Sequence, residues 1–192
     1  MSDSQAKKFH DEGVALFRKG NLEGALQKFT NALQEADNNS RRAAEICNDL
    51  GVVHTQLEDY EAAHQALDEA QNRFTTLNDE KGQAQTLGNR AALYQAEGLL
   101  EEAVETYKES AQLFEALGEN DMAMYVWQAV SRLRMKQGQY IAAIGAYEEG
   151  VDNMPQSSFK RKVLQQILKA PSALLGGGSS SSDDDDELDQ EE

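Results

Sequence analysis

Residues 127–147 read WQAVSRLRMKQGQYIAAIGAY, and residues 9–29 read FHDEGVALFRKGNLEGALQKF. Aligned end to end, both stretches begin and end with an aromatic residue and carry a glycine near the middle, at Gly138 and Gly20. On each side of the glycine, apolar and small residues recur at steps of three and four, the spacing of one helical face. Glycine adopts the left-handed cap conformation at low cost and ends a helix there. Each stretch therefore predicts two helices joined by a tight turn.

The same pattern occurs four times along the chain. Its most regular member is an alanine, spaced 38, 40 and 40 residues apart, at Ala25, Ala63, Ala103 and Ala143. An aromatic residue or leucine follows each alanine at the same distance: Phe29, Leu67, Tyr107 and Tyr147. One helical hairpin cannot bury its apolar face alone, and about three stacked copies make a stable array. Four copies, with no alternating β-branched stretches between them, predict an all-α solenoid.

The turns inside the copies differ in how well they are specified. Asn21 and Asp59 stand where the second helix of a copy needs an N-cap, and their side chains can accept a backbone hydrogen bond. Leu99 and Gln139 stand at the equivalent positions and cap less well. Glu58 replaces the turn glycine of the second copy. We expect small residues such as the repeated alanines to let the helices of a hairpin approach, and large ones to fill the space between hairpins: Phe29, Tyr107 and Trp127.

This arrangement of small and large residues resembles that of tetratricopeptide repeat (TPR) proteins. The first copy carries it at Phe9, Gly13, Gly20, Leu22, Ala25, Phe29 and Ala32, and the last at Trp127, Gly138, Tyr140, Ala143, Tyr147 and Pro155. The middle copies depart from it, since Cys47 and Leu87 replace the aromatic residue. The repeat is also longer than the family's usual one, as in kinesin light chain and some bacterial regulators. The resemblance implies a right-handed α-solenoid of four hairpins, at about residues 5–39, 43–78, 83–118 and 123–156.

The C-terminal part has a different composition. After Pro155, residues 157–170 carry apolar residues along one side and predict a helix that caps the last hairpin. Residues 171–192 contain a glycine- and serine-rich stretch and an acidic run, which we expect to be a disordered linker and tail. Residues 183–192 hold eight acidic residues and no basic one, half of the net charge of −16.

Composition restricts the function classes. The net charge of −16 disfavours nucleic acid as a partner, because a phosphate-binding surface needs clustered Lys and Arg. No apolar run approaches the roughly 20 residues that span a bilayer, and the first residues are too polar for a secretory signal. The single cysteine, Cys47, excludes an internal disulfide and suits a reducing compartment. We therefore expect a cytoplasmic protein with no membrane partner.

Motifs of catalysis are missing from the sequence. It contains no phosphate-binding GxxxxGK[ST], no HExxH, no CxxC and no GxSxG. His54 follows Cys47 by two helical turns, about 10 Å of rise, too far for a nucleophile and its base. We interpret Cys47 as a core residue and the three histidines as surface or inter-helix polar residues. The predictions are no enzymatic activity, no cofactor and no metal.

In TPR proteins the first helix of each hairpin lines a concave groove, and this resemblance supplies candidate partner-binding residues: Asn48, Gln85, Asn89, Tyr125, Gln128, Arg132, Met135 and Lys136. Tyr125, Arg132, Met135 and Lys136 make the last hairpin the most ligand-like. An equally weighted alternative is that Met122, Met124 and Tyr125 only pack against the capping helix. Some family members grip the C-terminal carboxylate of chaperone peptides through a clamp of Lys, Asn and Arg, but only Asn89 matches that clamp here.

These features favour a non-enzymatic adaptor or assembly scaffold that binds a partner peptide or helix in the groove. Two alternatives involve the acidic tail, at Asp183, Asp184, Asp185, Asp186 and Glu187. The tail could bind basic proteins, as a chaperone would, or fold back and block the groove. The partner is a protein or peptide of unknown identity, and we expect a monomer or a weak homodimer.

Overall fold

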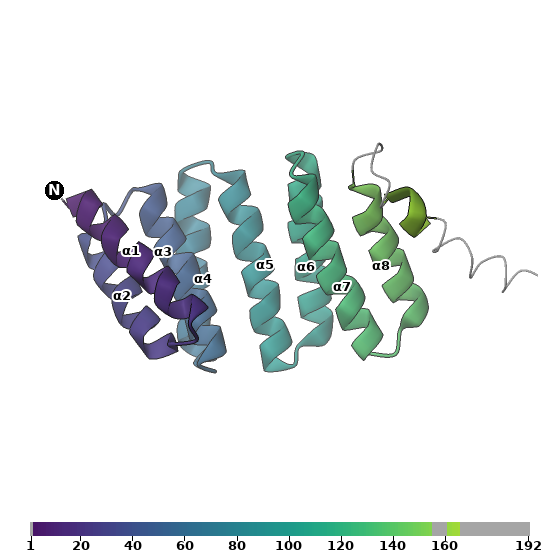
Figure 1. Cartoon of the computed structure of the whole chain (residues 1–192), viewed down its shortest axis with the longest axis horizontal. Helices are drawn as coiled ribbons and strands as arrows, with labels where there is room; N and C mark the ends of the chain where they lie inside the picture. The colour runs from purple at the N-terminus through teal and green to yellow at the C-terminus, as the bar shows by residue number, and fades with distance from the viewer. Residues whose placement is uncertain (1, 155–160, 166–192) are drawn as a thin grey trace, which may run out of the picture.

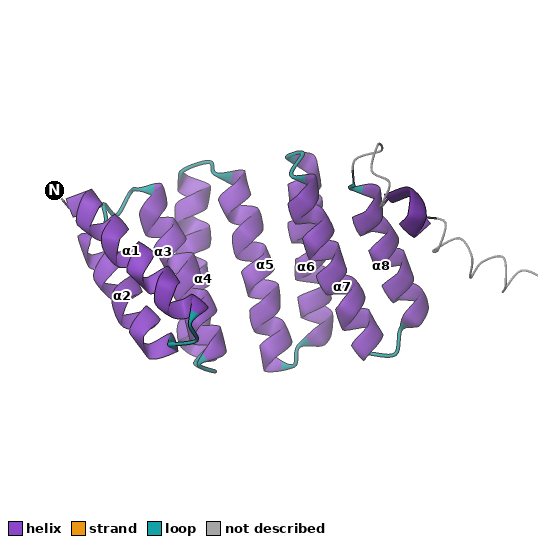
Figure 2. Cartoon of the chain, viewed as in Figure 1, coloured by secondary structure: helices purple, strands orange, loops and turns teal. Residues whose placement is uncertain are grey.

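The computed structural model describes residues 2–154 and 161–165, and all regular structure in these residues is helical (Figure 2). Within residues 2–154, eight helices follow one another along the long axis of the molecule (Figure 1). Their bounds are α1 Ser2–Arg18, α2 Leu22–Glu35, α3 Arg41–Gln56, α4 Tyr60–Thr76, α5 Glu80–Glu97, α6 Leu100–Ala116, α7 Asn120–Lys136 and α8 Tyr140–Asp152. The prediction of an all-α solenoid is confirmed. Each first helix begins slightly upstream of the predicted hairpin start.

The helix caps at the turns inside the hairpins are those expected from the sequence. Asn21 accepts a hydrogen bond from the backbone N–H of Gly24 at 2.9 Å, and Asp59 accepts one from Ala62 at 3.3 Å. Neither α6 nor α8 has a side-chain cap, as expected from Leu99 and Gln139. The turn glycines have φ between 75° and 83°, at Gly20, Gly98 and Gly138, and Glu58 adopts the same left-handed conformation with φ of 60°.

Close approach inside the hairpins depends on glycine as well as alanine. A Cβ at Gly13 would lie 2.6 Å from the ring of Phe29, so this ring packs directly on the α1 backbone. Phe29 therefore lies within the first hairpin, where it also joins a cluster with Ile46 of α3. Phe29 thus fills space between the first two hairpins as expected, and Gly13 also leaves room for its ring against the α1 backbone. Trp127 does join two hairpins, since its Nε1–H donates to Glu115 of α6 at 2.6 Å.

The two helices of each hairpin pack together, and each second helix packs on the first helix of the next hairpin. Among the first helices, α3 packs on α5, whereas α7 packs mainly on α6 and α8. No helix in the described ranges is long and apolar enough to cross a membrane.

Of the predicted capping helix at 157–170, only residues 161–165 are described, and they are helical. Arg161 and Gln165 bond to Asp152 at the end of α8, at 3.1 Å and 2.9 Å.

Candidate functional site

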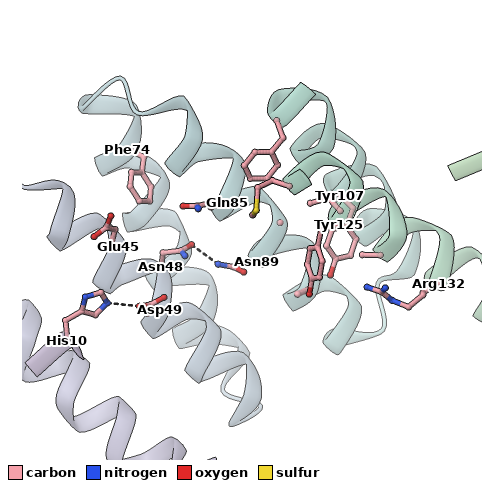
Figure 3. A pocket seen from close by; sticks show the side chains of 16 residues that line it. His10, Glu45, Asn48, Asp49, Phe74, Gln85, Asn89, Tyr107, Tyr125 and Arg132 are labelled. Atoms are coloured by element: carbon pink, nitrogen blue, oxygen red, sulfur yellow. Dashed lines mark hydrogen bonds and ion pairs between the residues drawn. The ribbon is translucent and has the colours of Figure 1, made fainter. Parts of the chain in front are cut away.

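A cavity of about 530 Å³ lies among α3, α5 and α7, with side chains of α4 and α6 contributing to its lining (Figure 3). It forms where α5 packs toward α3 and α7 packs on α6, which leaves the side chains of α6 accessible between α5 and α7. The cavity is therefore a consequence of how the third and fourth hairpins are stacked. Most of its lining residues belong to first helices.

Polar side chains on α1, α3 and α5 make one wall. Asn89 Nδ2 of α5 donates to Asn48 Oδ1 of α3 at 3.0 Å (Figure 3). His10 Nε2 of α1 lies 2.7 Å from Asp49 Oδ2 of α3. These contacts join successive hairpins and hold the amide and carboxylate groups in place. Gln85 also lines this wall.

The other side of the cavity is apolar and aromatic. Phe114, Met122 and Val126 line it there, and Phe114 is 1 % exposed; Phe74, also 1 % exposed, lines the cavity beside Glu45 and Gln85 (Figure 3). Met122 packs against the core cluster of the last two hairpins. Tyr125 also lines the cavity and is 62 % exposed. A solvent-exposed aromatic ring at the edge of a cavity is a surface that an apolar side chain of a ligand can cover.

Basic residues lie at the α7 side. Arg132 lines the main cavity and also a smaller cavity of about 180 Å³, whose other lining residues include Lys136, Tyr107 and Gln95. Burial raises the pKa of the Tyr107 phenol, the neighbouring Tyr125 raises it further, and the charge of Arg132 opposes the shift. Tyr107 therefore remains a neutral hydroxyl over the physiological range and can donate a hydrogen bond.

The structure brings together five of the predicted groove residues around the main cavity: Asn48, Gln85, Asn89, Tyr125 and Arg132. Lys136 lies in the adjoining small cavity. Gln128 is half-buried and Met135 is 51 % exposed, and neither lines these two cavities. The tail residues Asp183, Asp184, Asp185, Asp186 and Glu187 lie outside the described part of the chain.

Sequence reasoning missed the aromatic residues that second helices contribute. Phe74, Tyr107 and Phe114 occupy repeat positions or their neighbours, and their pattern indicated core residues only. They are buried, but one side of each also reaches the cavity. No periodicity distinguishes such a side chain from one that is enclosed on all sides.

Two other expectations concern cysteine and histidine. Cys47 is a buried free thiol, and burial raises its pKa against the opposing charge of Arg73, so the core interpretation is confirmed. His10 and His64 link successive hairpins, through Asp49 and through Glu97 at 3.1 Å. Within residues 2–154 and 161–165, no group of three or more His, Cys, Asp or Glu side chains is placed to hold a metal ion.

Three solved structures share the fold at low sequence identity. BtubC (BKLC) from P. vanneervenii aligns with a TM-score of 0.66 and 16 % identity, over 100 % of this chain and 72 % of that one. Aspartyl phosphate phosphatase F from Bacillus subtilis aligns with a TM-score of 0.74 and 13 % identity, over 92 % of this chain and 49 % of that one, so the chain spans about half of its length. MamA aligns with a TM-score of 0.56 and 16 % identity, over 77 % of each chain. The TPR-type architecture is thus confirmed.

No curated protein matches the sequence. A family model, however, matches residues 25–170, which include most of the solenoid, the small cavity and all of the main cavity's lining except His10. The matching model is that of "Soluble NSF attachment protein, SNAP". The chain belongs to the soluble NSF attachment protein (SNAP) family.

Proposed function

We propose that this chain is a non-enzymatic adaptor that holds a segment of a protein partner in the cavity among α3, α5 and α7. The observation that carries the proposal is the exposed ring of Tyr125 in the lining of an open cavity. A solvent-exposed tyrosine at the edge of a pocket is a typical anchor of protein interfaces. The family is named for attachment to NSF, which supports a role in protein attachment.

The cavity has the features of a peptide-binding groove. Its volume of about 530 Å³ accommodates a few side chains of an extended segment or of one helix face. Gln85 and the Asn48–Asn89 pair offer amide groups to the backbone or polar side chains of such a segment. The exposed ring of Tyr125 offers apolar area for an anchor residue. This combination of an apolar centre and a polar edge is common in non-obligate interfaces.

The test compares two tyrosines of equal exposure. Tyr125 lines the cavity and Tyr140 at the start of α8 does not, while both are 62 % exposed. We expect Tyr125→Ala to weaken capture of a partner about tenfold, as truncation of an aromatic anchor costs about 1–2 kcal/mol. Tyr140→Ala should leave capture unchanged. The measurement is quantitative affinity purification with mass spectrometry, with circular dichroism to verify the fold of both variants.

A partner retained by wild type and by Tyr140→Ala but lost from Tyr125→Ala supports the adaptor. Equal retention of every partner by the two variants contradicts binding in this cavity.

A further inference from the structure

The face of α8 that points away from α7 carries an apolar patch at one end and acidic residues at the other. Its residues follow one another at steps of three and four, so they share one side of the helix: Ile141, Ile144, Glu148 and Asp152. Buried small residues such as Ala143 and Gly150 form the opposite side, against α7. Ile141 is 86 % exposed and Ile144 is 37 % exposed. In a helical stack such an end face needs a cover, because the last hairpin has no neighbour to bury it.

The chain itself already contacts the acidic end of this face. Arg161 Nη2 and Gln165 Nε2 donate to Asp152 Oδ1 at 3.1 Å and 2.9 Å. Arg161 Nη1 also donates to the backbone carbonyl of Met154 at 2.7 Å, and only 17 % of the Arg161 side chain is exposed. Residues 161–165 are helical, so Arg161 and Gln165 lie one turn apart on the side that faces α8. The chain therefore leaves residue 165 beside the row of side chains that leads to Ile141.

We propose that the ten residues after this contact, QILKAPSALL at 166–175, pack antiparallel along α8 and cover Ile144 and Ile141. We call residues 166–175 the cover segment. It goes beyond the capping helix expected at residues 157–170, because its last contacts come from Leu174 and Leu175, which follow Pro171. In this arrangement the linker that follows residue 175 begins beside the turn between α7 and α8.

The length and composition of the cover segment fit this path. Ile141 lies 11 residues before Asp152 on α8, about 16 Å along the helix axis. A helix that ends before Pro171 and an extended stretch after it span about 24 Å, which is enough to reach Ile141. Beyond the segment, residues 176–192 contain a single large apolar residue, Leu188. The cover segment itself contains four: Ile167, Leu168, Leu174 and Leu175.

Charge complementarity supports the antiparallel direction of the segment. In an antiparallel pair of helices, a step of four residues forward on one helix matches a step of four residues back on the other. Since Gln165 contacts Asp152, Lys169 comes opposite Glu148. A basic and an acidic side chain thus meet between the Asp152 contact and the two isoleucines. A second copy of the chain fits this face less well, because each copy carries a net charge of −16 and like charges repel.

Disulfide formation in the full-length chain tests the position of the cover segment. The chain's own cysteine, Cys47, is 2 % exposed and does not compete. The test variant combines Leu175→Cys with Ile141→Cys. Two control variants combine Leu175→Cys with Tyr140→Cys or with Ala142→Cys, which keeps the tether but turns the thiol about 100° around α8 to either side. Because a disulfide requires Cα atoms within about 7 Å, we expect the test variant to form its disulfide about tenfold faster than either control. Non-reducing gels at low protein concentration give the rates, and mass spectrometry identifies the linked peptides.

A second measurement tests the two leucines without a cross-link. The chain with Ile141→Cys alone is alkylated with a maleimide, in the presence and absence of Leu174→Ser/Leu175→Ser. The thiol should react about tenfold faster when both leucines are replaced, since the loss of two buried leucine side chains releases the cover segment. Leu188→Ser is the matched control, because it removes a leucine that lies beyond the linker, and it should not change the rate. Circular dichroism checks that all variants remain helical.

The outcomes decide between the candidate occupants of the apolar patch. Selective intramolecular cross-linking at position 141, with faster alkylation when the leucines are replaced, supports the cover segment. Equal cross-linking rates at positions 140, 141 and 142, or an alkylation rate that the leucines do not affect, overturn it. Disulfides that form mainly between two copies of the Ile141→Cys variant also overturn it and assign the patch to a second copy of the chain. Neither measurement involves the cavity among α3, α5 and α7, so each of these failures leaves the proposed adaptor standing.

Discussion

Glu58 occupies the turn position that glycine holds in the other three hairpins, and its φ of 60° is left-handed. This backbone conformation costs a non-glycine residue about 1–2 kcal/mol. Glycine avoids that strain, but it loses more backbone entropy on folding, which offsets part of the gain. We therefore expect Glu58→Gly to stabilise the protein by about 0.5–1 kcal/mol. The measurement is the midpoint of urea unfolding, followed by circular dichroism.

The equivalent turn of the third hairpin provides a control substitution that should lower stability rather than raise it. Gly98 has φ of 83°, and a Cβ there would meet no atom within 4 Å. Gly98→Ala thus changes backbone strain without a clash, and we expect it to destabilise by about 1–2 kcal/mol. If both substitutions leave the midpoint unchanged, the turn conformation contributes nothing measurable to stability.

At the scale of elements, hairpins depend on contact between one helix backbone and the side chains of its neighbour. A Cβ at Gly51 of α3 would lie 2.6 Å from Leu67 of α4. We expect Gly51→Ala to destabilise by about 1–3 kcal/mol, because overpacking forces the two helices apart or Leu67 out of its rotamer. The check is the free energy of unfolding in urea, measured against wild type.

A glycine within α8 separates this clash from helix propensity. Gly145 also lies inside a helix, but a Cβ there meets no atom within 4 Å. Gly145→Ala should therefore stabilise by about 0.5–1 kcal/mol, the propensity gain of alanine in a helix. Stabilisation by Gly51→Ala as well would show that α3 and α4 are not packed as closely as described.

At the scale of the whole molecule, the hairpins form a linear stack in which each one contacts only its neighbours. Interior helices such as α3 are enclosed on several sides, and Ile46 and Val53 are fully buried. The last helix, α8, packs mainly on α7 and leaves Ile141 86 % exposed. Stability in such an array is a sum of repeat and interface contributions, so the ends open more easily than the centre.

We expect amide hydrogen exchange to be slower in α3 and α4 than in α8, when each rate is divided by its intrinsic value. Exchange followed by mass spectrometry of peptic fragments measures this difference. Equal protection of α3, α4 and α8 would mean that the solenoid opens only as one cooperative unit, and the argument from neighbour contacts would be wrong.

The sequence by itself determined the helices, their turns and the register of the repeats. These features depend on interactions over short distances along the chain: three- and four-residue spacing of apolar side chains, glycine in left-handed turns, and caps such as Asn21 and Asp59. Because the same residue pattern occurs in four copies, a position that is ambiguous in one copy can be assigned from the other three. Glu58 could therefore be assigned to a turn from its place in the pattern. Five of the eight candidate groove residues line the main cavity, since the face of a first helix is set by its periodicity.

Only the tertiary structure decided where the cavities lie and which buried side chains reach them. That depends on how α5 and α7 are positioned over α6, which is the summed result of packing between whole hairpins. For this reason Tyr107 and Phe114, core residues by their pattern, also line the main cavity, while Gln128 and Met135 line neither of the two cavities. The pairing of Arg134 with Glu101, which leaves Arg132 and Lys136 facing the small cavity, is likewise a contact between separate hairpins. Periodicity along one helix carries no information about such contacts between distant segments.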